Sequence, residues 1–207
     1  MGKVILDMSM SLDGFIAGPN VNCKQGLGEG GEVLHEWLFS GDIPSKFNDF
    51  FKLSRTNREV FDKSFKTTGA LIAGRRTFDL TSGWGGSYPI QGIPVFVLTH
   101  DPPKEIPRGE TAFTFVSDGI VSAVKQAKAA AEKNNVQVMG GAITAQQCIK
   151  ANLVDEILIH LVPVLLGKGI RLFDPIGPEK IQLEKGDVIE TADVTHLRYR
   201  ILNSRNT

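Results

Sequence analysis

Two positions in the 207-residue chain combine glycine with hydrogen-bond donors directly after an apolar run. The first brings a pair of arginines to the start of a predicted helix, and consists of Ala70–Ala73, Gly74, Arg75, Arg76 and Thr77. A helix N-terminus offers free backbone N–H groups and a positive dipole end, and arginine has forked donors that fit phosphate. This junction favours an anionic ligand, although solvated arginines, or arginines paired with a local acid such as Asp79, also explain it.

The second position is a glycine pair between the apolar run Val136–Met139 and a predicted helix. Its residues are Gly140, Gly141, Ala142, Ile143 and Thr144. A glycine pair lets a phosphate group approach the backbone, but it equally suits a tight turn with positive φ. Two such junctions in one chain indicate a ligand with several phosphates, such as a dinucleotide.

A literal G-x-G-x-x-G also occurs, at residues 26–31. The dinucleotide fingerprint needs a buried strand immediately before its glycines, because they turn that strand into a helix. Here the preceding residues, 20–25, are mostly polar. We therefore predict a flexible loop at Gly26, Gly28 and Gly31 rather than a phosphate cradle.

The other reactive side chains argue against several kinds of site. The histidines show neither a pair four residues apart nor a carboxylate–histidine cluster with metal spacing, so we expect no metal; they are His35, His100, His160 and His196. The G-x-S-x-G elbow of many hydrolases does not occur. Cys23 and Cys148 form no C-x-x-C motif, and Trp37 and Trp84 suit either a flat pocket or the core.

Composition is that of an ordinary globular protein, with 42% hydrophobic and 22% charged residues. The 23 basic residues balance 23 acidic ones, which gives no support for binding nucleic acid or a membrane surface. No apolar run reaches the roughly 20 residues of a membrane span. Asp7 interrupts the first apolar segment before a signal-peptide core could form. We expect a cytoplasmic protein whose partner is a small molecule, with no nucleic acid and no membrane.

Apolar runs alternate with helical patterns along most of the chain. Strands are predicted at Val4–Met10, Ala70–Ala73, Ile93–Thr99, Ala112–Val116, Val136–Met139 and Val154–Val164. Helices are predicted at Glu32–Phe39, from a Thr56 or Asn57 cap to Lys66, at Arg75–Leu80, from a Ser117 or Asp118 cap to Lys133, and at Ile143–Ala151. Alternating residues at Lys180–Glu190 and Asp193–Leu202 predict an antiparallel hairpin. The pattern predicts one α/β domain over residues 1–207, with a mainly parallel central sheet and an antiparallel C-terminal hairpin.

These motifs resemble those of dihydrofolate reductases. Gly74–Phe78 is similar to their nucleotide-binding helix start, Ser11–Gly18 to their active-site loop, and Met139–Ala142 to their pyrophosphate-binding glycine pair. A closer resemblance is to the reductase domain of bacterial bifunctional riboflavin-synthesis deaminase-reductases, and it rests on Val154–Ile157, His160–Gly169 and Leu172–Phe173. The resemblance covers nearly the whole chain, residues 20–60 least. It implies a dihydrofolate-reductase-like three-layer fold and use of NADPH.

The resemblance also implies roles for individual residues. Arg75 would meet the adenosine 2′-phosphate. The other implied cofactor contacts are Gly74, Arg76, Thr77, Gly140, Gly141, Ala142, Ile143 and Thr144 for the phosphates, Thr99 and His100 for the adenosine half, Met8, Ile16 and Ala17 for the nicotinamide, and Gly167 and Gly169 for the mouth of the site.

Dihydrofolate reductases carry an acidic residue after the active-site loop that hydrogen-bonds the pteridine, but here residues 20–60 hold extra sequence. The nearest catalytic candidates are Asp62 and Glu59 on the helix before the Ala70 strand, and Asp13 is a third. A solvated helix face explains the first two equally well, and a structural role in the loop explains Asp13. The zinc-ligand motif that the deaminase half needs does not occur, so the resemblance concerns the reductase half alone.

We therefore predict an NADPH-dependent reductase that transfers a hydride to a C=N or C=O bond of a small, heterocyclic substrate. The alternatives are the riboflavin-pathway reductase of 5-amino-6-(5-phosphoribosylamino)uracil, and a non-catalytic nucleotide-binding module. A ribose-phosphate substrate needs a second basic cluster, for which Lys168 and Arg171 are the candidates. Because the apolar strand Val154–Val164 needs cover on both faces, and the reductase-domain relatives resemble dimers, we expect a homodimer built partly on the C-terminal sheet.

Overall fold

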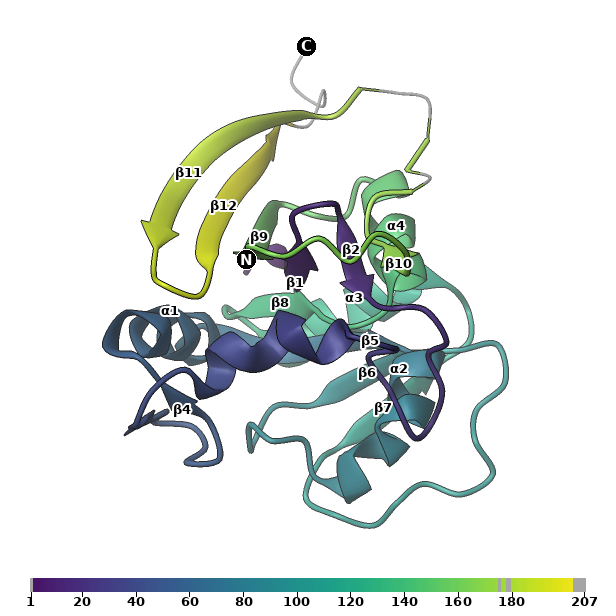
Figure 1. The fold of residues 1–207 in the computed structure, drawn as a ribbon. Helices are drawn as coiled ribbons and strands as arrows, with labels where there is room; N and C mark the ends of the chain where they lie inside the picture. The colour runs from purple at the N-terminus through teal and green to yellow at the C-terminus, as the bar shows by residue number, and fades with distance from the viewer. Residues whose placement is uncertain (1, 175, 178–179, 203–207) are drawn as a thin grey trace.

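An eight-stranded sheet forms the centre of the protein in the computed structural model, which describes residues 2–174, 176–177 and 180–202 (Figure 1). Its spatial order is β11-β12-β9-β1-β8-β5-β6-β7. In chain order the strands are β1 Val4–Ser11, β5 Thr68–Gly74, β6 Val95–Leu98, β7 Phe113–Val116, β8 Asn135–Val138, β9 Glu156–Val162, β11 Gln182–Glu190 and β12 Thr195–Leu202. The strands from β9 to β7 run parallel, whereas β12 and β11 are antiparallel additions beside β9.

Helices cover both faces of this sheet, which gives three layers. On one face lie α3 Ile120–Ala131 and α4 Ala142–Lys150, and on the other lie α1 Arg55–Lys66, α2 Arg75–Leu80 and the 3-10 helix η1 Gly31–Phe39. Alternate residues of a strand point to opposite faces, so Ala70 and Ile72 pack with the first set of helices while Leu71 and Ala73 pack with the second. The predicted three-layer α/β class is confirmed.

Short elements border the sheet. The segment after β1, predicted as a loop, contains β2 Phe15–Ala17, which pairs with β10 Ile170–Arg171. A second small pair joins β3 Ile43–Pro44 to β4 Lys52–Leu53, and a 3-10 segment, η2, spans Ser82–Gly86. The β2–β10 pair holds the loop after β1 against the segment after β9.

Two predicted helix caps are wrong. Ser54 caps α1 by accepting a hydrogen bond from the Asn57 N–H, so Asn57 lies inside the helix with its side chain buried. Helix α3 begins after Gly119, which has a φ of 97° and no side-chain cap bond, rather than at Ser117 or Asp118. Asn57 is thereby free for a different role, described below.

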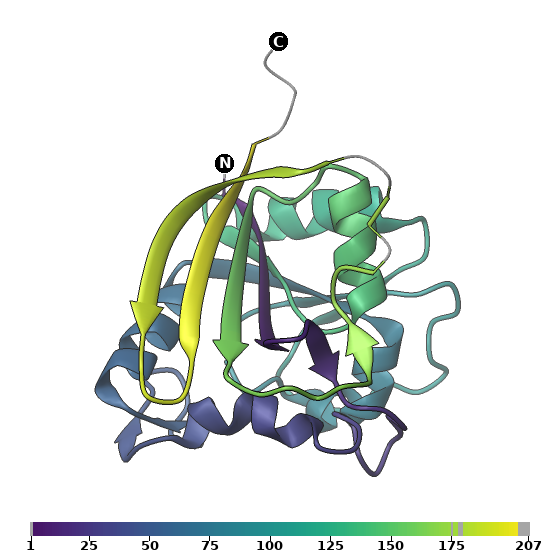
Figure 2. The ribbon, with the colours of Figure 1, turned by 45° about the horizontal axis from the view of Figure 1, so that its top comes forward.

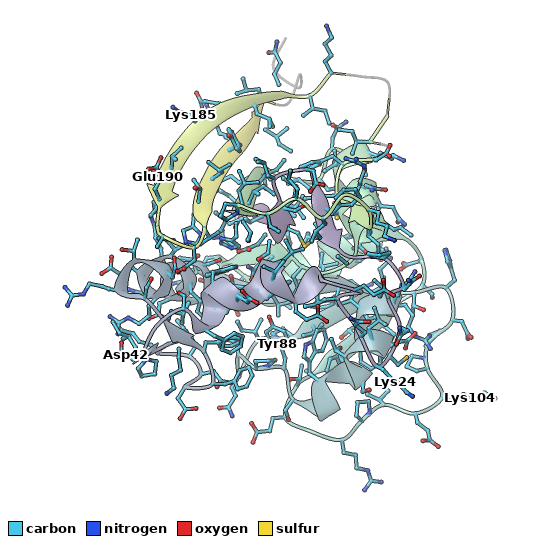
Figure 3. All side chains as sticks on the ribbon, viewed as in Figure 1. Lys24, Asp42, Tyr88, Lys104, Lys185 and Glu190 are labelled. Carbon is cyan, nitrogen blue, oxygen red and sulfur yellow. The ribbon has the colours of Figure 1, made fainter. Side chains whose placement is uncertain are left out.

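Both faces of β9 are covered within the chain, because Ile157 and Ile159 pack in one core and Val162 in the other. The hairpin strand β11 is exposed along nearly its whole length and forms one edge of the sheet (Figure 2). Lys185 and Glu190 mark this strand at the periphery of the molecule in Figure 3. Residue 1 and residues 203–207 of the predicted domain lie outside the described residues. In the described part, no helix combines the length and the apolar character needed to cross a membrane.

Candidate functional site

A cavity of about 470 Å³ opens where the parallel strands β1, β5 and β8 end. Its lining includes residues of β1, the start of α2 and the turn from β8 into α4. Ligands of open α/β sheets bind at the carboxyl ends of parallel strands, and a volume of this size suits part of a cofactor together with a small molecule.

The two glycine junctions predicted from the sequence meet at this cavity. Gly140 has a φ of 70°, and a Cβ built on it would lie 2.6 Å from Thr77 Cγ2. A Cβ on Gly74 would lie 2.5 Å from Thr144 Oγ1. Each junction therefore needs glycine because the other junction packs against it, and together they form a surface of backbone and small side chains.

Half of the predicted cofactor residues line the cavity: Met8, Ile16, Ala17, Arg76, Thr77, Gly140, Gly141 and Ala142. Helix α4 begins here, and its cap, Gly141, makes no side-chain hydrogen bond to the first turn. The free end of α4, the guanidinium of Arg76 and the hydroxyl of Thr77 are the groups that a pyrophosphate needs. The residues present therefore fit a dinucleotide.

The remaining predicted cofactor residues do not line the cavity. Arg75 donates to Asp79 Oδ1 at 2.8 Å and to the carbonyl of Asp101, which matches the alternative of pairing with a local acid. The others are Gly74, Thr99, His100, Ile143, Thr144, Gly167 and Gly169. Thr99 is buried and bonds the backbone of Asp101, whereas His100 and Ile143 are exposed.

The glycine-rich loop borders the cavity through Gly26 and Leu27. Gly28, with a φ of 71°, packs against the carbonyls of Gly18 and Pro19, where a Cβ would lie at 2.5 Å. The glycine at position 28 is thus explained by a positive φ and close backbone packing.

None of the three predicted catalytic acids lines the cavity. Glu59 is exposed on α1. Asp62 is buried and accepts hydrogen bonds from Ser45 Oγ at 2.7 Å and from the Lys46 N–H at 3.2 Å. The residues of α1 that line the cavity are instead Phe61, Ser64 and Phe65.

Asp13 anchors a loop. Its carboxylate accepts hydrogen bonds from Ser11 Oγ at 2.7 Å and from the N–H groups of Leu166 at 3.1 Å and Gly167 at 2.7 Å. The hydrogen bond from Ser11 is the main reason that the pKa of Asp13 falls to about 2, and the two backbone N–H groups lower it further. Asp13 joins the loop after β1 to the segment after β9.

Asp7 is the acidic side chain in the cavity wall among the residues that the structure describes. Its Oδ1 accepts from His160 Nε2 at 2.9 Å, and its Oδ2 accepts from Ser64 Oγ at 3.0 Å and from the Gln137 amide. Burial raises the pKa of Asp7, but the charge of His160 and the hydrogen bonds from His160, Ser64 and Gln137 outweigh burial, so the pKa lies below its ordinary value.

A row of polar side chains crosses four adjacent strands at this wall: His196 on β12, His160 on β9, Asp7 on β1 and Gln137 on β8. Strand register creates the row. His196 lies directly opposite His160, and Asp7 lies opposite Leu158, two residues before His160 on the same face. Gln137 lies opposite Ile5, two residues before Asp7. We name these four residues the polar row.

Helices α1 and η1 cover the polar row. His160 Nδ1 lies 2.6 Å from His196 Nδ1, and His196 Nε2 lies 3.0 Å from Oδ1 of Asn57 on α1. The ring of Trp37 on η1 packs against both imidazoles, at 4.5 and 5.2 Å between centroids. Sequence spacing could not reveal the pair of Asp7 and His160, because the two residues are 153 positions apart and meet only in the folded sheet.

Aromatic side chains form much of the rest of the cavity wall: Trp37, Phe51, Phe61, Phe65, Trp84 and Tyr88. Tyr88, labelled in Figure 3, is buried, and burial together with the charge of Asp7 raises its pKa. Burial lowers the pKa of His35, another wall residue, to about 4, and the charge of His160 contributes. A flat, uncharged ring would find apolar cover and a few polar contacts on this wall.

Basic side chains are scarce in the cavity wall. Arg76 is the one lysine or arginine among the described residues that line the cavity. Lys168 is exposed outside it. Arg171 donates to the Asp13 carbonyl at 2.9 Å, and its guanidinium carbon lies 4.4 Å from the centre of the Phe15 ring. The two candidates for a second basic cluster therefore do not meet at the cavity.

Three layers, this strand order and a cavity at the strand ends define a dihydrofolate-reductase-like fold. Dihydrofolate reductase from Enterococcus faecalis, complexed with NADP(H), matches it with a TM-score of 0.52 at 15% identity, over 98% of both chains. The chain belongs to the RibD C-terminal domain family, whose model matches residues 2–197.

Two relatives match nearly end to end. The uncharacterized protein YwjB of Bacillus subtilis is 27% identical over 188 residues, which cover 88% of this chain and 89% of YwjB. The crystal structure of a putative riboflavin biosynthesis protein from Shewanella sp. PV-4 superposes with a TM-score of 0.70 at 24% identity, covering 97% of this chain and 99% of that one. The predicted resemblance to riboflavin-synthesis reductase domains is confirmed at the level of family and fold.

Proposed function

We propose that the protein is an NADPH-dependent reductase that delivers a hydride to a C=N or C=O bond of a small, planar heterocycle. The observation that carries the proposal is the contact between the two glycine junctions, which places Arg76, Thr77 and Gly140 in one cavity with the polar row. The solved dihydrofolate reductase of the same fold is complexed with NADP(H), which supports this choice of cofactor.

The protein's part in this reaction is to bind, orient and exclude water. Gly140, Gly141 and the start of α4 would hold the pyrophosphate, with Arg76 and Thr77 beside it, and Met8, Ile16 and Ala17 would border the nicotinamide. When bound, the cofactor supplies the hydride. The aromatic wall opposite would cover the substrate ring and keep water away from it.

The family match favours a second candidate, the riboflavin-pathway reductase of 5-amino-6-(5-phosphoribosylamino)uracil. Its substrate carries a ribose phosphate, which calls for basic side chains beyond those that hold the cofactor. Arg76 is committed to the cofactor phosphates in our proposal, so the cavity favours a substrate without phosphate. A non-catalytic nucleotide-binding module is the third candidate, and it differs from the first two in consuming no cofactor.

The test begins with titration of NADPH and NADH against the purified protein at fixed ionic strength. We expect NADPH to bind at least about tenfold more tightly, because one charge-assisted hydrogen bond contributes about 1.5–3 kcal/mol. Oxidation of NADPH is then followed at 340 nm with pairs of pyrimidines and pterins, each offered with and without a ribose phosphate. If neither nucleotide binds, the reductase assignment is contradicted. If NADPH binds but no substrate causes its oxidation, the non-catalytic nucleotide-binding module is favoured.

We also propose that the protein forms a homodimer through the exposed edge strand β11. Strand β9 needs no partner subunit, because both of its faces are covered within the chain. An exposed strand edge is, however, a template for pairing, and β11 presents the exposed side chains of Leu183 and Val188. Light scattering at micromolar concentrations should give twice the chain mass, and a monomer would contradict the dimer. The cytoplasmic location stays a prediction.

A further inference from the structure

Three consecutive contacts link Asp7, His160, His196 and Asn57. Asp7 Oδ1 lies 2.9 Å from His160 Nε2, His160 Nδ1 lies 2.6 Å from His196 Nδ1, and His196 Nε2 lies 3.0 Å from Asn57 Oδ1. Each contact is a hydrogen bond and needs one hydrogen between its two atoms. The four side chains therefore need three hydrogens in these contacts.

Neutral side chains supply too few of them. The carboxylate and the amide oxygen at the two ends are acceptors, and a neutral imidazole carries a single N–H. Two neutral rings thus provide two hydrogens for three contacts. The third hydrogen is an additional proton on one ring, which is then an imidazolium, because hydrogen bonds and the charge of His160 hold the pKa of Asp7 below its ordinary value.

The orientation of the Asn57 amide is fixed by its other partners. Its Nδ2 donates to Ser40 Oγ at 2.9 Å, and Ser40 Oγ donates in turn to the carbonyl of Trp37 at 2.9 Å. Because a carbonyl can only accept, the Ser40 hydrogen is used there, and Ser40 must accept from Asn57. The amide oxygen of Asn57 consequently faces His196, which must donate to it.

The additional proton also makes the network electrically neutral. The side chains of Asp7 and His160 are 10% and 7% exposed, and an unpaired buried carboxylate would be costly. Arg76 lines the same cavity, but its guanidinium donates to the Val21 carbonyl at 3.3 Å and is not among the hydrogen-bond partners of Asp7. Three other titratable side chains nearby are held neutral. Burial and the charge of His160 lower the pKa of His196 to about 3, burial lowers that of His35 to about 4, and burial raises that of Tyr88. The proton therefore belongs to Asp7 and His160.

A metal ion between the two imidazoles would not fit this geometry. Two nitrogens bound to one zinc ion at about 2.1 Å lie more than about 3 Å apart, whereas His160 Nδ1 and His196 Nδ1 are 2.6 Å apart. In the part of the chain that the structure describes, no group of three or more metal-ligating side chains is arranged to hold an ion. The contact is a hydrogen bond.

We propose that Asp7 and His160 store one proton in the cavity wall and that Asp7 delivers it to the heteroatom of the substrate, with His196 and Asn57 as positioning residues. This proposal rests on the proposed reductase function. Both Asp7 and His160 line the cavity. Reduction of C=N or C=O adds a hydride from the nicotinamide to carbon, the π electrons move onto nitrogen or oxygen, and that atom takes the stored proton. Asp7 is left as a carboxylate beside a neutral His160, and water returns the proton.

The stored proton can be observed without cofactor or substrate. Nitrogen NMR of the ¹⁵N-histidine-labelled full-length protein at about pH 8 should show one imidazole with hydrogens on both nitrogens, because three contacts need three hydrogens. His100→Gln assigns the exposed ring, and Asp7→Asn should abolish the extra proton. Four neutral imidazoles and an ionised Asp7 at pH 8 would overturn the proposal, whether or not NADPH binds.

Kinetics test the delivery, with the best substrate from the panel above. Asp7→Asn should lower kcat at least about a hundredfold, since general acids contribute about 10²–10⁴-fold, and should leave KM and the Kd of NADPH within about threefold. The pH dependence of kcat should also disappear in Asp7→Asn. Glu110→Gln, which removes an exposed charge elsewhere, is the control. A kcat within threefold of the unmodified protein overturns delivery by Asp7. If no nucleotide binds, the proposed reductase function is contradicted. The NMR result still decides whether Asp7 and His160 hold the additional proton.

Discussion

The cavity has two walls of different origin. One is the junction wall, made of Arg76 and Thr77 at the start of α2 and of Gly140 and Gly141 before α4. The other is formed by the three residues of the polar row that line the cavity, Asp7 on β1, Gln137 on β8 and His160 on β9, with His196 on β12 bonded to His160 outside the lining. Within each junction, the residues of the first wall are adjacent in the sequence. The residues of the second wall are far apart in the sequence and become neighbours only across the sheet.

This difference separates two tasks. The junction wall offers backbone N–H groups and a guanidinium, which suit the fixed shape and charge of a phosphate-bearing cofactor. The polar row offers a hydrogen-bond network whose proton count can change, which suits a chemical step. Variants of the first wall should therefore change cofactor binding, and variants around the second should change proton behaviour.

The largest expected effect is that of a side chain at Gly140. A Cβ there would lie 2.6 Å from Thr77 Cγ2, in the wall that we assign to the pyrophosphate. We expect Gly140→Ala to weaken NADPH binding at least about a hundredfold, or about 2.7 kcal/mol. Gly92→Ala is the matched control, because Gly92 also has a positive φ, 76°, but nothing lies within 4 Å of its Cβ position. Calorimetric titration of both variants would contradict this wall assignment if they bound NADPH equally well.

The two arginines should differ in the cofactor that they affect. Arg76 lines the cavity, so Arg76→Ala should weaken NADPH and NADH alike, by about ten- to a hundredfold. Arg75 lies outside, bonded to Asp79 and to the Asp101 carbonyl near the end of β6. Arg75→Ala should weaken NADPH by about tenfold and leave NADH nearly unchanged if Arg75 meets the 2′-phosphate. Titrations at fixed ionic strength decide this, and equal losses for both nucleotides would remove that role from Arg75.

The junction wall could be predicted from the sequence because its signal is local. An apolar run followed by glycine and a helical pattern identifies both the turn and the exposed helix end, and helix Arg75–Leu80 was predicted with its observed bounds. The mainly parallel sheet with its antiparallel hairpin followed from the pattern of strands and helices, and the three-layer fold followed from the family resemblance.

The polar row could not be predicted in this way because it depends on register. Asp7, Gln137 and His160 are polar residues with apolar neighbours on both sides in their strands, a pattern that does not reveal a partner on a neighbouring strand. Asp7 did carry one signal, since a charged residue inside a buried strand needs a partner. Glu59 and Asp62 on α1 were instead the candidates for catalysis. In the structure Asp62 accepts a hydrogen bond from Ser45 Oγ and does not line the cavity.

The pH dependence of folding should report the neutral rings around the polar row. Burial lowers the pKa of His35 from 6.5 to about 4, so its stabilising contribution is complete above pH 6.5 and is lost as the pH falls toward 4. Each such group makes the free energy of unfolding fall by up to about 1.4 kcal/mol per pH unit in that window. His35→Gln should reduce this slope by the contribution of one titrating group, up to about 1.4 kcal/mol per pH unit. The substitution His100→Gln, at an exposed residue, should leave the slope nearly unchanged. Urea unfolding between pH 4 and 7 measures both slopes, and an unchanged slope in His35→Gln would show that His35 is not held neutral.

The smallest effect is expected at Asp13, the acid that the sequence offered as a catalyst and the structure ties to Ser11, Leu166 and Gly167. Its pKa falls from 3.8 to about 2, chiefly through the hydrogen bond from Ser11, so its contribution to stability is present above pH 3.8 and is lost as the pH falls toward 2. Asp13→Asn cannot titrate, and the dependence of stability on pH in that narrow window should disappear. Because Asp13 does not line the cavity, the Kd of NADPH should stay within about threefold. Thermal unfolding between pH 2 and 5 and a nucleotide titration give the two readouts. If Asp13→Asn instead abolished the pH dependence of kcat while Asp7→Asn did not, the roles of the two acids would be exchanged, and the proton would enter the cavity from the loop rather than from the sheet.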